Sequence, residues 1–111
     1  MKKIVLAAAL VAAGSGFAVA DNARDTIARK YGEAMALSEL CTDLRFNSGR
    51  ATVYLAAAHI EFDDTFKAVA TVSHNRTLTD LAGKQADDIC LVGEALYGPN
   101  GTNGPGLLER K

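Results

Sequence analysis

The sequence is short of the residues that most catalytic and metal sites use. Its 111 residues include no tryptophan, two histidines and two cysteines. It has no Gly-x-Ser-x-Gly, no His-Glu-x-x-His and no glycine-rich loop ahead of Lys-Ser/Thr, so the signatures of hydrolases, zinc peptidases and phosphate-binding loops are missing. His59 and His74 have no histidine or cysteine partner at metal-ligand spacing. We therefore expect a protein that is not an enzyme and uses no metal or other cofactor.

The sequence also lacks a concentration of positive charge. The net charge is −1, and the basic residues are scattered along the chain rather than gathered in one stripe. Binding to nucleic acid or to anionic membrane surfaces needs such a stripe, and no tryptophan is present to stack on bases. Nucleic acid is therefore excluded as an expected partner.

One hydrophobic run stands out, at the N-terminus. Lys2 and Lys3 precede an apolar stretch over residues 4–13 that is too short to span a bilayer, and Ala18-Val19-Ala20 offers the small-x-small pattern that a signal peptidase recognises. This predicts a signal peptide over residues 1–20 and a mature chain that begins at Asp21. No later segment approaches 18 uninterrupted apolar residues, so we expect a periplasmic or secreted protein without stable membrane insertion after cleavage.

The two cysteines, Cys41 and Cys90, both lie in the predicted mature chain. In an oxidising compartment an even count without metal-type spacing indicates a disulfide, and one intramolecular pairing is possible. A redox site would have the cysteines close together, as in Cys-x-x-Cys. A bridge over about 50 residues restricts the unfolded chain by roughly 4 kcal/mol, which a domain this small needs.

The pattern of apolar residues predicts an all-α fold, a small four-helix domain over residues 21–97. A first helix runs from Asp21 to about Leu44, because apolar residues recur there at steps of three and four. Asn47 or Ser48 can cap a second helix that reaches about Ile60.

A third helix follows Asp63 or Asp64, either of which can cap it. Residues 69–73 could instead form a short strand, since β-branched residues cluster there, but helix is preferred. A break is expected at residues 73–77, followed by a fourth helix that Gly83 kinks or splits in two and that ends at Gly98.

Residues 98–111 form a Gly/Pro/Asn-rich C-terminal arm that carries Leu107 and Leu108 near its end. Two large apolar residues beyond a run of turn formers need something to bury them. Docking on the protein's own helices is the favoured interpretation. In the alternative, both leucines are partner-binding residues that insert into another protein.

Two groups of carboxylates could carry chemistry. Glu61, Asp63 and Asp64 lie close together, and Asp87 and Asp88 are adjacent. Their spacing does not match a calcium-binding loop, so we interpret them as helix caps and solvated charges. A carboxylate-based hydrolase is the weaker alternative.

In length, export signal and cysteine spacing the chain resembles the small acid-stress chaperones of enteric periplasms, the HdeA/HdeB type. Those proteins are also exported and helical and carry one disulfide over a loop of similar length, which here joins Cys41 to Cys90. The resemblance is one of overall plan. It implies a helical, chaperone-like protein.

We therefore expect a small exported protein that binds another envelope or exported protein, as a chaperone or an accessory subunit. The alternative is a small-molecule binding protein with a pocket among the helices, and four residues could supply its polar groups: Tyr31, Arg50, Tyr54 and His59. The identity of the partner and the oligomeric state stay open at this point.

Overall fold

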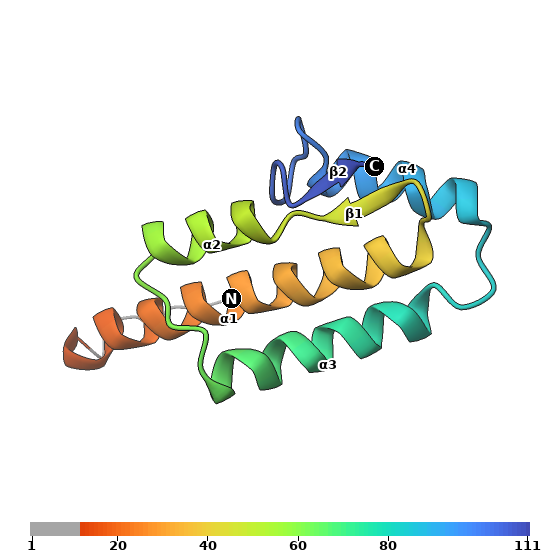
Figure 1. The fold of residues 1–111 in the computed structure, drawn as a ribbon. Coiled ribbons are helices and arrows are strands. Elements are labelled where there is room, and N and C mark those ends of the chain that lie inside the picture. The colour runs from red at the N-terminus through yellow and green to blue at the C-terminus, as the bar shows by residue number, and fades with distance from the viewer. Residues whose placement is uncertain (1–11) are drawn as a thin grey trace.

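The computed structural model describes the backbone of residues 12–111 and the side chains of residues 23–111. The elements follow in the order α1 (Ala12–Leu40), β1 (Leu44–Phe46), α2 (Ser48–Ala57), α3 (Asp64–Asp80), α4 (Ala86–Tyr97) and β2 (Leu108–Arg110). In Figure 1, α1 lies between α3 on one side and α2, α4 and the two strands on the other. The predicted four-helix domain with one disulfide is confirmed, but the fold is not purely α.

A two-stranded sheet was missed by the sequence analysis. β1 pairs with β2 in antiparallel register, with Leu44 opposite Arg110 and Phe46 opposite Leu108. The first helix accordingly ends at Leu40 and not near Leu44. Strands of three residues are too short to show an alternating pattern, and the contacts that stabilise them come from the other end of the chain.

Two predicted helix caps are confirmed. The Asn47 side chain accepts a hydrogen bond from the backbone N–H of Arg50 at the start of α2, and the Asp63 carboxylate accepts one from Phe66 N–H at the start of α3. Each satisfies a backbone donor that the first helical turn would otherwise leave without a partner.

The predicted break at residues 73–77 is wrong, because α3 continues through it to Asp80. Polar side chains in this stretch form hydrogen bonds while the backbone stays helical. The Thr77 hydroxyl donates to Ser73 O, and the Ser73 hydroxyl donates to Arg29 O on α1. The preferred prediction of helix for residues 69–73 is confirmed. The chain turns instead at Gly83, whose φ of +82° favours glycine, so the predicted fourth helix is split and α4 begins at Ala86.

The α1–α3 interface is very close. Ala28, Gly32 and Ala36 are buried one helical turn apart on α1, and α3 presents Ala70 to them. A Cβ on Gly32 would lie 2.1 Å from Ala70 O. Small side chains at this position are therefore what allows the two backbones to approach each other.

The main core lies on the other side of α1, where α4 and the sheet meet it. The Cys41–Cys90 disulfide, with a Cα–Cα distance of 5.2 Å, confirms the predicted pairing and joins the end of α1 to α4. Leu107 and Leu108 are both buried in this core. The arm therefore docks on the protein's own helices, as the favoured interpretation held, and in this conformation neither leucine is open to a partner.

Part of the predicted signal peptide, residues 1–11, lies outside the described residues, and residues 12–20 belong to α1. Among the described residues, no helix combines the length and the apolar character needed to cross a membrane.

Candidate ligand-binding site

α2 is attached to the rest of the described chain more loosely than the other helices. Its backbone approaches other elements at the fewest points, and Ala51 is its one buried residue. Val53, on its outer side, is 58% exposed. A helix that buries one small side chain contributes little apolar area to the core, so space is left beneath it.

Two cavities lie in that space, and Tyr31 of α1 and Ala51 of α2 line both of them. We name the two cavities together the α2 cleft. The first, of about 310 Å³, reaches the C-terminal arm, and its lining consists of Ile27, Lys30, Tyr31, Ala51, Tyr54, Asn103, Gly104, Pro105 and Leu107. The second, of about 490 Å³, reaches the start of α3 and is lined by Tyr31, Ser48, Ala51, Thr52, Leu55, Ala56, Ile60 and Phe62. Both volumes lie within the range of small-molecule sites.

Tyr31 also lines a third cavity, of about 400 Å³, in the groove between α1 and α3. Its ring lies 4.9 Å from that of Phe46 and 5.5 Å from those of Phe62 and Phe66, measured between centroids. Burial raises the pKa of the Tyr31 hydroxyl above its usual value. Tyr31 thus lines both cavities of the α2 cleft and the cavity between α1 and α3.

The polar groups around the first cavity are few. The Tyr54 hydroxyl donates a hydrogen bond to Pro105 O, which ties α2 to the arm. Asn103 Nδ2 donates to the Tyr97 hydroxyl at 2.7 Å, and that hydroxyl donates to the Glu33 carboxylate. Burial is the main reason why the pKa of Tyr97 is raised. These bonds fix the wall that the arm contributes to the cavity.

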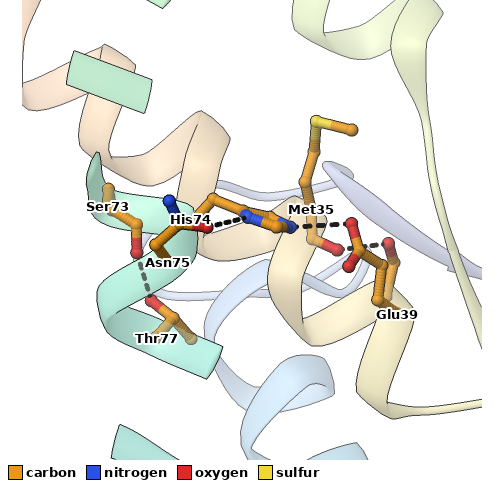
Figure 2. Close-up of polar contacts among 7 residues, drawn as sticks. Met35, Glu39, Ser73, His74, Asn75 and Thr77 are labelled. Carbon is orange, nitrogen blue, oxygen red and sulfur yellow. Dashed lines mark hydrogen bonds and ion pairs between the residues drawn. The ribbon is translucent and has the colours of Figure 1, made fainter. Parts of the chain in front are cut away.

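The α1–α3 groove ends at an ion pair between His74 and Glu39, shown in Figure 2. His74 Nε2 lies 2.7 Å from Glu39 Oε2, and Nδ1 lies 3.2 Å from Asn75 Oδ1. With an oxygen atom beside each ring nitrogen, the doubly protonated imidazolium is favoured, and the hydrogen bond to Glu39 raises the pKa of His74. The pair links α3 to α1.

The structure brings together two of the four residues predicted for a small-molecule site. Tyr31 and Tyr54 line the same cavity of about 310 Å³. Arg50 does not line this cavity; together with Tyr54 it lines a smaller and more polar depression of about 230 Å³. His59 is exposed in the turn after α2, with a φ of +56°, and lines neither cavity of the α2 cleft.

The carboxylates do not gather into one site. Glu61 and Asp63 lie between α2 and α3, where Asp63 is engaged as the helix cap, while Asp87 and Asp88 occupy the first turn of α4. The length of α3 separates the two groups, as Figure 1 shows. Within the part of the chain whose side chains are described, no three histidine, cysteine, aspartate or glutamate residues are grouped to hold a metal ion.

Lys30 and Asn103 belong to the first cavity and were missed by sequence reasoning. A signal for Lys30 was present, because Ile27, Lys30 and Tyr31 are spaced to share one side of a helix. No local signal existed for Asn103, which reaches the cleft because the arm folds back.

Comparison of the chain with protein-family models, with curated proteins and with solved structures gave no match. The similarity in plan to the acid-stress chaperones therefore rests on length, the predicted export signal and cysteine spacing alone.

Proposed function

We propose that the protein is a small exported binding protein without catalytic activity, and that the α2 cleft binds a small molecule with an apolar body. The observation that carries this proposal is the cavity of about 310 Å³ in which Tyr31 and Tyr54 meet between α1, α2 and the arm. Apolar walls with a few polar groups are typical of small-molecule sites.

The rest of the molecule supports a binding role in an oxidising compartment. The disulfide persists where thiols are not kept reduced, which agrees with the export signal predicted over residues 1–20. The disulfide and the docked arm hold the core, so the cleft can stay open without unfolding the domain.

A titration with 1-octanol followed by nuclear magnetic resonance tests the proposal. Saturable shifts are expected at the amides of residues 27–31, 48–57 and 103–107. The variant Ala51→Phe places a ring where both cavities of the cleft meet and should abolish these shifts. Ala57→Phe adds the same ring at an exposed position on α2 and should leave them intact.

Circular dichroism of both variants shows whether the fold is retained. The absence of any saturable binding to the parent protein would overturn the proposal. So would equal binding by the parent protein and a folded Ala51→Phe variant.

A second candidate is the binding of an exported protein partner, including a chaperone-like role. The observation in its favour is that Phe62, which lines the second cavity, is 48% exposed, so the apolar surface of the cleft continues to the outside. In an aggregation assay with an unfolding client protein, this role predicts protection at stoichiometric amounts that is lost in Phe62→Ser. Unchanged client aggregation at neutral and acidic pH would remove it.

A further inference from the structure

The cavity of about 310 Å³ has one charged residue in its lining, Lys30. The remaining wall is largely apolar and comes from side chains such as Ile27, Ala51 and Leu107. A charge at the edge of an apolar pocket gives the site a direction, because a bound molecule must place its own polar end there.

Two of the four polar side chains that line this cavity have donors without acceptors in the part of the chain that the structure describes. Within the described residues, neither the Lys30 ammonium nor the Tyr31 hydroxyl has a hydrogen-bond or ion-pair partner. The other two polar side chains are already engaged: the Tyr54 hydroxyl donates to Pro105 O and Asn103 Nδ2 donates to Tyr97. A lysine ammonium has three donors and no acceptor capacity.

Glu33, the acidic residue one turn after Lys30 on α1, does not form an ion pair with the Lys30 ammonium. Glu33 accepts a hydrogen bond from the buried Tyr97 hydroxyl, and its carboxylate lies more than 4.0 Å from the Lys30 ammonium, since no ion pair forms between them. Glu33 therefore serves the network that holds α4 and the arm, while the positive charge of Lys30 remains available to a ligand.

From these contacts we infer that the ligand is an anionic amphiphile, with a single apolar chain in the α2 cleft and a carboxylate or similar anionic head that accepts hydrogen bonds from the Lys30 ammonium. A charge-assisted hydrogen bond from the ammonium then supplies the preference for an anion over a neutral head. This inference rests on the proposed function, because it names the ligand class of the same cleft.

Three probes that share an eight-carbon chain test the inference: octanoate, 1-octanol and octylammonium, each titrated into the oxidised protein at neutral pH. Octanoate should bind about tenfold more tightly than 1-octanol, and octylammonium should bind most weakly. Because this ranking is measured on the parent protein, it does not depend on any variant folding.

The variant Lys30→Met keeps the apolar stem and removes the charge, so it should abolish the preference for octanoate while 1-octanol binding is retained. Lys84→Met removes a lysine from the exposed turn between α3 and α4 and should leave the preference unchanged. Equal binding of octanoate and 1-octanol, or tighter binding of octylammonium, would overturn the inference and leave the cleft as an apolar site. Failure of all three probes to bind would overturn the proposed function itself.

Discussion

α1 packs against α3 and against α2 in opposite ways. At its contact with α3, Gly32 lies so close to Ala70 that no further atom fits between the backbones, and the cavity of about 400 Å³ lies along the groove beside this contact. Toward α2, the helices are separated by cavities of about 310 and 490 Å³, and Ala51 is the one residue of α2 that is buried. A closely packed interface does not adapt easily to an added atom. The side chains that line an unfilled apolar cavity lack van der Waals contacts, and a ligand can supply these contacts. α1 is thus part of a rigid scaffold at its contact with α3, and we propose that it forms a wall of the binding site beneath α2.

The largest effect is expected from the disulfide, which holds α1 to α4 and so supports the scaffold. Replacing both Cys41 and Cys90 by alanine should reduce the free energy of unfolding by roughly 4 kcal/mol, since the bridge closes a loop of 49 residues. Thermal unfolding followed by circular dichroism should show the midpoint falling by more than about 10 °C. A change of only a degree or two would mean that packing alone holds the scaffold.

The next largest effect comes from adding one methyl group to the close interface. Gly32→Ala should destabilise the protein by about 3 kcal/mol, because the new Cβ would meet backbone atoms of α3 that cannot move independently. Gly49→Ala on α2 is the matched control: its Cβ would come no closer than 3.4 Å to the Asn47 side chain, and alanine favours helix. Chemical denaturation of the two variants measures the difference, and equal stability of both would contradict the comparison.

A smaller effect is expected where α2 is tied down. Tyr54→Phe removes the hydrogen bond to Pro105 O, which contributes about 1 kcal/mol. Since α2 buries one residue, we expect it to open locally, so that global unfolding changes little while amide exchange within α2 rises by up to about tenfold. Hydrogen exchange followed by mass spectrometry distinguishes local opening of α2 from global unfolding. An equal change in α3 would show that α2 does not open on its own.

The smallest effect concerns the ion pair between α1 and α3. The pKa of His74 is raised, mainly by its hydrogen bond to Glu39, so the pair stabilises the fold while the imidazole is protonated and stops doing so as the pH rises through that pKa, above the ordinary value of 6.5. Both side chains are partly exposed, so the loss should stay below about 1 kcal/mol. In Glu39→Gln, an NMR titration should show the pKa of His74 lowered. An unchanged titration would contradict the assignment.

Local signals predicted much of the scaffold and little of the cleft. The caps at Asn47 and Asp63 and the disulfide followed from residue types that act on their immediate surroundings or have one available partner. The sheet did not, because its two strands of three residues come from opposite ends of the domain and stabilise each other only after folding. Tyr31 and Tyr54 were recognised as candidates, whereas Asn103 enters the site through the return of the arm.

Amide hydrogen exchange with and without octanoate is the measurement that tests the account most directly. In the free protein, the amides of Ser48–Ala57 should exchange through local opening and much faster than those of residues 28–36 and 66–77, which form the close interface. Octanoate should slow exchange in α2 selectively, since it fills the space that α2 leaves open. If α2 exchanges as slowly as α3 in the free protein and octanoate changes nothing, α2 is a fixed part of the core and the cleft is not a binding site.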